Sequence, residues 1–448
     1  MMGDPLIARR SWLRLFAATL TSSVRWQAFQ APSIASLVPV LGGRRPAYGG
    51  SARLQLPLPL DRLDPHDPSC LDSGLLGPAV FETLYAVTAT GQPFPALASA
   101  LPERVGTRFR IRLRPSMVFS DRQSLDGQSA VNSILRSQRF SQSLSELGKP
   151  RPVSGDQLSF EVTGSSSARI ATVLSQPRAA IVPHHFVPTR PLGCGAFSAR
   201  LRAETIELRR NPLAPRGGSY LDRVQIARST VSDALRSFEA TRSDFALFGS
   251  GLHQSRPGAI QLQLEKWANV VLVGSPGWSG VSRPGQLHAH LRHLPGGPFS
   301  ALGVDRVRGG HARWGGASFS ILVPRENRWL YEIALEIKGA WERSSGSIEV
   351  LPLSAVALSR RIASGNYDTY LTALCTSGVE SRHRTADLFA LAGVQAPRSG
   401  RNLSEEEACR QLRIGLVGSC RPALASSPQL TADVHGGALD LSNARRRL

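Results

Sequence analysis

The chain has 448 residues, of which 42% are hydrophobic and 19% are charged. This composition is typical of a globular protein with two or three core-bearing lobes, and it excludes a disordered tail or a bundle of membrane helices. The formal net charge is +20, and nearly all of it is arginine, since Lys149, Lys266 and Lys338 are the only lysines. A basic surface attracts nucleic acid or anionic lipid head groups. No basic stripe interleaved with aromatics and no zinc-finger or helix-turn-helix spacing is present, so we expect scattered, solvated charge and no nucleic-acid partner.

The first 35 residues have the pattern of an export signal. Arg9-Arg10-Ser11-Trp12-Leu13-Arg14 is similar to a twin-arginine motif. Residues 15–24 form an uncharged, largely apolar stretch of the length of a signal h-region, too short to span a membrane. We therefore predict a periplasmic or cell-envelope location for the protein, with residues 36–51 as a Gly-, Pro- and Arg-rich linker. An amphipathic basic N-terminal helix is the alternative interpretation of residues 1–35.

Hydrophobic periodicity predicts the first elements of the folded body. Leucines at every second position of residues 52–60 predict a half-buried strand, and residues 109–113 alternate in the same manner. Residues 126–136 change to helical spacing, with Asp126 as a possible N-cap. Gly193 and Gly195 can adopt positive φ, which favours a tight turn before a strand at residues 206–210.

Further along the chain, strands and helices are predicted to alternate. The strands are at residues 319–324, 348–350 and 369–374, and the helices are at residues 329–343 and 355–364. Such alternation predicts βαβ units and a largely parallel sheet.

Several short motifs follow one another in a characteristic order. They are Leu63-Asp64-Pro65-His66, Phe81-Glu82-Thr83-Leu84-Tyr85, Pro95-Ala96-Leu97-Ala98, Ala130-Val131-Asn132-Ser133-Ile134-Leu135-Arg136, Gly193-Cys194-Gly195-Ala196-Phe197 and Asn211-Pro212. In this order they resemble the family 5 extracellular solute-binding proteins, the oligopeptide, dipeptide and nickel receptors of ABC importers. The resemblance runs from about residue 52 to the C-terminus, with a poor stretch at residues 279–316, in a chain that is divergent and shorter than typical members.

The resemblance implies an α/β, two-lobed periplasmic-binding-protein-like fold of type II, with a hinge and a ligand cleft between the lobes. It implies a first lobe at residues 52–252 with an inserted subdomain at about 73–189, a second lobe at 253–412, and a return to the first lobe at 413–448. The implied function is capture of a peptide or similar small polar solute and its delivery to a membrane permease by a monomer, without catalysis or a cofactor. A degenerate member that acts as an interaction or sensory module is the alternative.

Three regions are candidate ligand sites on the same resemblance. The loop at residues 69–73 is the best matched, because the equivalent loop lines the pocket in the family. Its candidates are Ser69, Asp72 and Ser73, of which Asp72 either meets a ligand ammonium group or caps a helix. Trp278 either covers a bound ligand or belongs to the core.

Peptide-binding members hold the ligand's amino terminus with a carboxylate that follows the strand at residues 369–374. Glu380 and Asp387 are the candidates for this role in the present chain, and Asp387 has a helix cap as its alternative.

Patterns that carry other chemistry are weak. His288, His290 and His293 have a spacing that can bind a metal, but Pro and Gly flank them in the poorly matched stretch, so we predict no metal site. The five cysteines form no C-x-x-C pair, and only Cys409 and Cys420 are near enough in sequence for a local disulfide. The chain has neither a G-x-S-x-G elbow nor a phosphate loop, which argues against a serine hydrolase and an ATPase.

Overall fold

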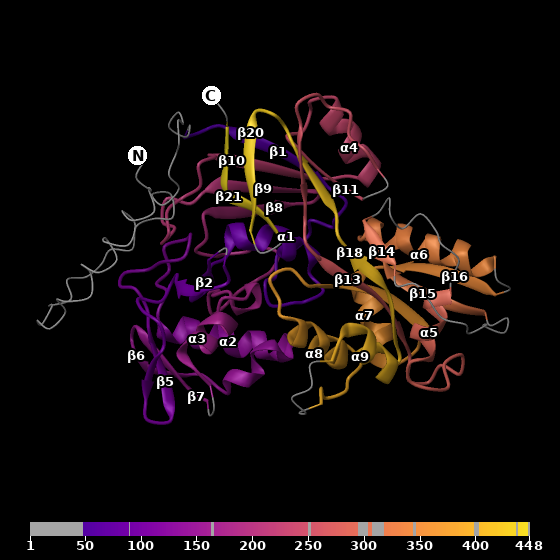
Figure 1. The fold of residues 1–448 in the computed structure, drawn as a ribbon, viewed down its shortest axis with the longest axis horizontal. Coiled ribbons are helices and arrows are strands. Elements are labelled where there is room, and N and C mark those ends of the chain that lie inside the picture. The colour runs from indigo at the N-terminus through magenta and orange to yellow at the C-terminus, as the bar shows by residue number, and fades with distance from the viewer. Residues whose placement is uncertain are drawn as a thin grey trace, which may run out of the picture. The chain divides into compact units, whose positions relative to one another are not determined.

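The computed structural model describes residues 48–88, 90–162, 165–249, 252–293, 303–306, 318–343, 346–397, 403–435 and 438–446. The predicted export signal and most of the predicted linker lie outside the described residues. Within the described ranges the strands form three larger sheets of seven, six and four strands and two strand pairs. We call the larger ones the first, second and third sheet (Figure 1). None of the described helices combines the length and apolarity needed to cross a membrane.

The first sheet has the order β12-β19-β11-β1-β10-β9-β8. Its strands are β1 (Ser51–Leu56), β8 (Phe197–Arg202), β9 (Thr205–Arg210), β10 (Arg223–Arg228), β11 (Phe245–Phe248), β12 (Ile260–Gln263) and β19 (Ala423–Ser426). The predicted first strand is confirmed for residues 52–56, where alternate residues of β1 are buried in the core, and is wrong for residues 57–60. The strand ends at Leu56, since Pro57 and Pro59 have no N–H to donate to a neighbour. Helix α4 (Val231–Glu239) connects β10 to β11, and both strands pair in parallel with β1.

The second sheet has the order β14-β18-β13-β17-β15-β16. Its strands are β13 (Ala268–Gly274), β14 (Val304–Arg306), β15 (Ser318–Pro324), β16 (Ser347–Leu353), β17 (Thr369–Cys375) and β18 (Ile414–Cys420). Its helices are α5 (Gln286–His293), α6 (Arg328–Glu342), α7 (Ala355–Ser364), α8 (Ser381–Leu391) and α9 (Glu405–Gln411). The predicted alternation of β15, α6, β16, α7 and β17 is confirmed.

The prediction of a largely parallel sheet holds only for the strands on which it was based. Among the described strands of the second sheet, β15 pairs in parallel with β16 and β17, whereas β13 pairs antiparallel with both β17 and β18. In the first sheet, β8, β9, β12 and β19 likewise make antiparallel pairs. Two parallel strands need a crossover connection, such as α6 between β15 and β16. Antiparallel strands need no crossover. Both sheets are therefore mixed.

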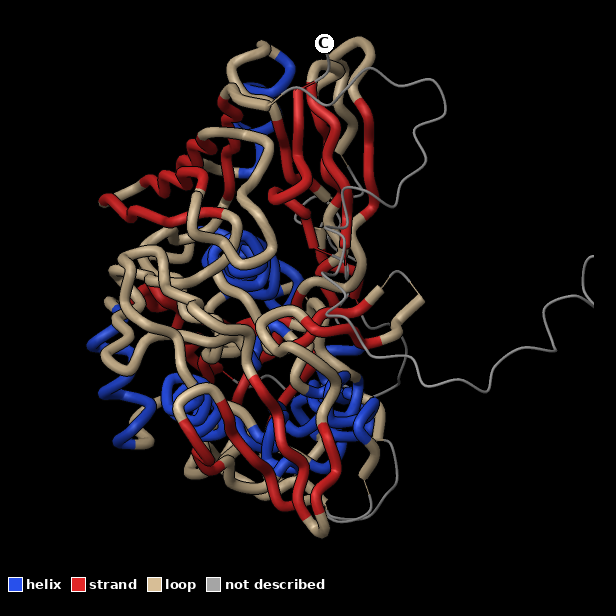
Figure 2. Tube along the Cα trace, turned by 90° about the vertical axis from the view of Figure 1, so that its left-hand side faces the viewer, coloured by secondary structure: helices blue, strands red, loops and turns tan. Residues whose placement is uncertain are grey.

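The third sheet has its own hydrophobic core. It contains β4 (Glu103–Val105), β5 (Arg108–Arg112), β7 (Gln157–Glu161) and β6 (Arg151–Ser154), accompanied by α2 (Gly127–Phe140) and α3 (Ser167–Val173). In Figure 2, viewed from the side on which this sheet lies, its strands run in front of blue helices. The N–H of Ser129 donates to the Asp126 carboxylate at 2.8 Å, which confirms the predicted N-cap of α2.

The remaining described elements are two strand pairs and helix α1. The strand pairs are β2 (Tyr85–Val87) with β3 (Pro93–Pro95) and β20 (Leu430–His435) with β21 (Ala438–Arg446). Helix α1 (Leu71–Val80) contributes to the core of the first sheet.

The chain changes sheet twice in this part of the sequence. Strand β12 is in the first sheet and β13 in the second, while β18 is in the second sheet and β19 in the first. We therefore propose crossings at residues 264–267 and 421–422, in place of boundaries at 252 and 412. The inserted subdomain then begins after α1.

All five cysteines are buried free thiols, so no disulfide joins Cys409 to Cys420. Burial raises the pKa of the Cys70 thiol and of the Cys409 thiol to about 12. Burial raises the thiol pKa of Cys194, Cys375 and Cys420 as well.

Gly193 and Gly195 serve a purpose other than the predicted one. Neither has positive φ. Both lie against the end of α1, where the N–H of Gly195 donates to the carbonyl of Val80 at 2.9 Å. A Cβ on Gly193 would lie 2.1 Å from the Val80 carbonyl oxygen, closer than any non-bonded contact. These glycines allow two backbones to approach, which a side chain would prevent.

We predict that Gly193→Ala lowers the free energy of unfolding by about 1–3 kcal/mol or more, because backbone must move to admit the methyl group. Urea denaturation measures this change. Gly155→Ala is the matched control, since a Cβ on Gly155 meets nothing within 4 Å. Equal stability of the two variants would refute the steric explanation.

Candidate functional site

The prediction of a loop at residues 69–73 is wrong for residues 71–73, which form the first turn of α1. The segment that leads into α1 packs against the end of β17. The carboxylate of Asp67 accepts hydrogen bonds from the Ser69 N–H at 2.8 Å and the Ser69 hydroxyl at 2.7 Å. The N–H of Cys375 donates to the carbonyl of Pro68 at 2.7 Å. Ser73 is buried, and its hydroxyl lies 3.4 Å from the Cys70 sulfur. Ser69 and Ser73 therefore have protein partners in this structure.

Asp72 lies in the first turn of α1, and the N-cap position belongs to Cys70. The Asp72 side chain is buried, and one carboxyl oxygen accepts from the N–H of Leu60 at 3.2 Å. Its other oxygen has no hydrogen-bond partner among the described residues. Burial, assisted by the nearby charge of Asp61, raises the pKa of Asp72 to about 8. The group is therefore mainly protonated at neutral pH and offers little charge to an ammonium group.

Asp387 forms a buried ion pair with Arg178. Asp387 lies within α8, so it is not that helix's cap, and Arg178 lies in the 3₁₀ turn Pro177–Ala179. The side chains are 3% (Arg178) and 2% (Asp387) exposed. The guanidinium also donates to the Ser141 hydroxyl at 3.0 Å and to the Cys375 carbonyl at 2.8 Å, and Ser141 donates to Asp387 at 2.5 Å. The candidate ligand carboxylate is thus neutralised by the protein's own cation.

Glu380 belongs to a second, more exposed group of charges. Its carboxylate pairs with Arg169 of α3 at 2.5 Å and with Arg382 of α8 at 3.1 Å. Glu146 joins the same group, accepting from Arg169 at 2.8 Å and from Arg382 at 2.7 Å. Glu380 and Asp387 therefore both contact the part of the chain that carries the third sheet. Glu380 does so through Arg169, and Asp387 through Arg178 and Ser141.

Trp278 is a core residue of the second sheet. It is 9% exposed, and its ring lies 5.1 Å from that of Phe319, which in turn contacts Trp341 with centroids 5.0 Å apart.

His288 and His290 of the predicted histidine pattern lie in α5. His288 is buried, and its Nδ1 accepts from the N–H of Leu416 at 3.3 Å. Burial lowers the pKa of His288 to about 4. No group of three potential metal ligands occurs within the described residues, which exclude the side chain of His293.

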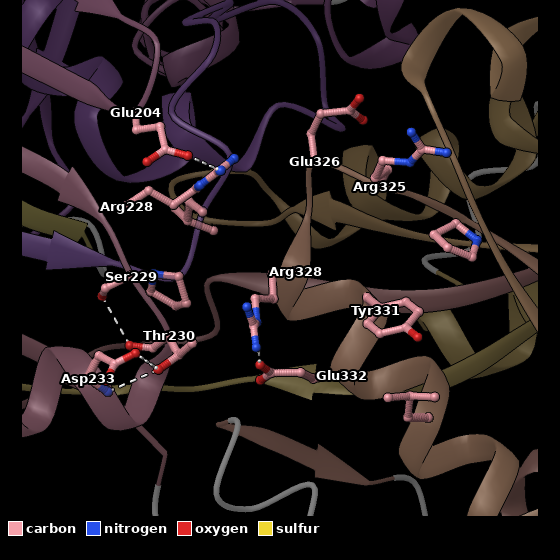
Figure 3. A pocket seen from close by; sticks show the side chains of 14 residues that line it. Glu204, Arg228, Ser229, Thr230, Asp233, Arg325, Glu326, Arg328, Tyr331 and Glu332 are labelled. Atoms are coloured by element: carbon pink, nitrogen blue, oxygen red, sulfur yellow. Dashed lines mark hydrogen bonds and ion pairs between the residues drawn. The ribbon is translucent and has the colours of Figure 1, made fainter.

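A groove of about 700 Å³ lies where strands of the first and second sheets end, and residue patterns did not reveal it. Pro57 follows β1 and Ser229 follows β10, while Arg325 follows β15 and Pro352 lies near the end of β16. Figure 3 shows the two walls, with Thr230 on one side and Tyr331 on the other. In α/β folds, ligands bind outside the carboxyl ends of parallel strands. In the sequence, the position of this groove could have been predicted from the residues that immediately follow the predicted strands.

The groove contains both paired and unpaired polar groups. Arg228 pairs with Glu204, and Arg328 pairs with Glu332 at 3.4 Å. Among the described residues, the side chains of Arg325, Glu326 and Tyr331 make no hydrogen bond or ion pair, and one Glu326 carboxyl oxygen is buried without a partner. A cation, a carboxylate and a hydroxyl are therefore available to a ligand. Such a set is complementary to a zwitterion.

We predict that Asp72→Asn makes the protein more stable at neutral and higher pH. The folded pKa of about 8 lies above the unfolded value of about 3.9, so Asp72 favours folding at low pH, and this contribution is lost as pH rises to about 8. The loss is about 1.4 kcal/mol per pH unit within that window. Urea denaturation at pH 5 and pH 7.5 measures it.

Asparagine retains the acceptor for Leu60 and cannot ionise, so the variant's stability should fall less between these two pH values than that of the wild type. Glu349→Gln removes one exposed carboxylate and serves as the control. An unchanged pH slope in Asp72→Asn would contradict the raised pKa.

Comparison with known proteins identifies the fold. No protein-family model and no curated protein sequence matches the chain. The oligopeptide-binding protein AppA from Bacillus subtilis, in complex with a nonapeptide, matches with a TM-score of 0.68 at 12% identity, over 90% of this chain and 100% of that chain. MoaA from A. tumefacien R10, in complex with mannopinic acid, matches with a TM-score of 0.66 at 12% identity, over 90% and 100%.

A third structure has the same extent of similarity. NikA from Staphylococcus aureus, in complex with Ni(L-His)2, matches with a TM-score of 0.63 at 12% identity, over 89% of this chain and 100% of that chain. This chain therefore has the two-lobed α/β fold of the family 5 solute-binding proteins, as the resemblance implied.

Proposed function

We propose that this protein is an extracytoplasmic substrate-binding protein of an ABC transporter, which captures a peptide or similar small polar solute and delivers it to a membrane permease. The observation that carries the proposal is a groove at the strand ends of both main sheets in a chain with a solute-binding fold. On this proposal the protein is exported, acts as a monomer and needs neither catalysis nor a cofactor.

The groove also supports the class of ligand. Its volume of about 700 Å³ lies within the range of about 300–1,000 Å³ that small-molecule sites have. Arg325 would meet a ligand carboxylate and Glu326 a ligand ammonium group, because neither side chain has a partner in the described part of the protein. A short peptide carries both groups.

The second candidate function is a degenerate solute-binding fold that acts as an interaction or sensory module without transport. The Arg178–Asp387 pair favours it, because Arg178 occupies one of the two candidate carboxylates for a ligand's amino group. A backbone hydrogen bond from the N–H of Cys375, at the end of β17, to the carbonyl of Pro68 adds a second contact nearby. A ligand that bound here would have to displace these contacts.

Native mass spectrometry of the protein, produced with and without residues 1–35, tests the main proposal. We expect a discrete co-purified mass that is released on denaturation, or one class of short peptide bound at one per chain from a mixed pool. A bare protein that ignores the pool would support the interaction module and direct the search to protein partners.

We predict that replacing Arg325 and Glu326 together with glutamine weakens peptide binding at least tenfold, because two charge-assisted hydrogen bonds are lost (about 1.5–3 kcal/mol each). Isothermal titration with the peptide class found above measures the change. Arg361→Gln, on the exposed surface of α7, is the control. Retained binding in the double variant would move the ligand site away from the groove.

We predict that Arg178→Gln or Asp387→Asn lowers the free energy of unfolding by about 3–5 kcal/mol, because either change leaves a buried charge without its partner. Urea denaturation of both variants and of the double variant forms a thermodynamic cycle. The exposed Arg236–Asp233 pair, at 72% and 50% exposure, is the control and should contribute less than about 1 kcal/mol. Additive losses at Arg178 and Asp387 would show that the two side chains are not coupled.

A further inference from the structure

The outer face of the first sheet carries a concentration of arginine. On the inner face of β1, β9 and β10, residues such as Leu54, Leu208 and Ile226 belong to the core. On the outer face, the register places Arg53 beside Gln225 and Gln225 beside Glu207. Residues paired across adjacent strands share a face of the sheet, so these side chains lie together.

A pocket of about 310 Å³ is formed on this outer face. Its charged and amide-bearing lining consists of Arg53, Arg202, Arg223, Arg242, Glu207, Gln55 and Gln225. Three of the arginines come from three different strands, and Arg242 comes from the turn between α4 and β11. The pocket therefore concentrates four guanidinium groups around one carboxylate.

The single carboxylate is already paired. Glu207 forms ion pairs with Arg223 at 2.5 Å and with Arg209 at 3.2 Å. The hydrogen bond from Arg209, with the charges of Arg209, Arg223 and Arg202, lowers the pKa of Glu207 against the opposing effect of desolvation, so the group stays ionised. In the described part of the protein, the side chains of Arg53, Arg202 and Arg242 pair with no carboxylate. Asp244, the nearest acid beside β1, accepts from the backbone N–H of Arg53 at 2.8 Å.

Unpaired like charges on one sheet face destabilise the protein unless something of opposite charge neutralises them. Guanidinium groups match the oxygens of phosphate, to which they donate two parallel hydrogen bonds. Arginines that converge from three strands and a turn surround a tetrahedral, multiply charged anion better than a flat carboxylate. Gln225 adds a neutral donor to the lining of the pocket.

We infer that this pocket binds a phosphate group, carried either by a small phosphorylated molecule or by a phospholipid head group. The site lies on the outer face of the first sheet and shares no lining residue with the groove at the strand ends. The phosphate site is therefore independent of the proposed peptide site. A protein that bound no peptide could still bind phosphate, and the reverse.

The test uses the full chain and two matched variants. Arg53→Gln with Arg202→Gln removes two exposed charges from the pocket, and Arg360→Gln with Arg361→Gln removes two exposed charges from α7. Isothermal titration with pyrophosphate, at low and at physiological salt, is compared with sedimentation on phosphatidylcholine vesicles with and without phosphatidylglycerol. Thermal unfolding of each variant checks that it remains folded.

We expect the wild type and the α7 variant to bind at least one of these probes, and the pocket variant to bind it at least tenfold more weakly. Pyrophosphate binding without vesicle binding would assign a small phosphorylated ligand, and vesicle binding that depends on Arg53 and Arg202 would assign a lipid head group. Failure to bind either probe would overturn the inference. Equal weakening in both double variants would also overturn it, because general attraction to a chain of net charge +20 would then suffice.

Discussion

The buried ion pair between Arg178 and Asp387 is the interaction on which the arrangement around β17 depends. Removing two charges from water costs several kcal/mol each, so such a pair persists only when all its polar atoms find partners. Ser141 and the carbonyl of Cys375 complete that set. Because these partners come from α8, the end of β17, the end of α2 and a separate turn, four distant segments are positioned by one polar cluster.

Arginine has a structural role elsewhere as well. Arg136 donates two hydrogen bonds to Asp64, at 2.8 and 2.7 Å, and a third contact of 2.9 Å reaches His66. Burial lowers the pKa of His66 to about 4, so this imidazole is neutral beside the guanidinium. The motifs that contain Asp64, His66 and Arg136 therefore hold α2 to the loop after β1. Lysine, with a single ammonium group, could not make this forked contact.

Local patterns in the sequence were sufficient for several elements and for one cap. The alternation in β1 and the position of Asp126 depend on neighbours within a few residues, so they were predictable. The mixed pairing of the sheets was not, because β13 and β18 meet across a separation that no periodicity records. The same holds for the approach of Gly193 to Val80.

The candidate site shows the same limit. Sequence motifs led to Asp387, but its partner Arg178 is 209 positions away and has no distinguishing neighbours. The burial that raises the pKa of Asp72 depends on packing of α1 against other segments, not on the residues beside it. Residues that follow separate strands, such as Pro57 and Arg325, meet only after the sheets have formed.

The five buried thiols make the folded protein resistant to thiol chemistry. A thiol reacts through its thiolate, and burial keeps all five protonated and covered. An alkylating reagent can therefore modify them only in molecules that have opened. The thiols lie at the N-cap of α1, in α9, in the strands β17 and β18, and shortly before β8. The order in which they are alkylated therefore reports which part of the protein opens first.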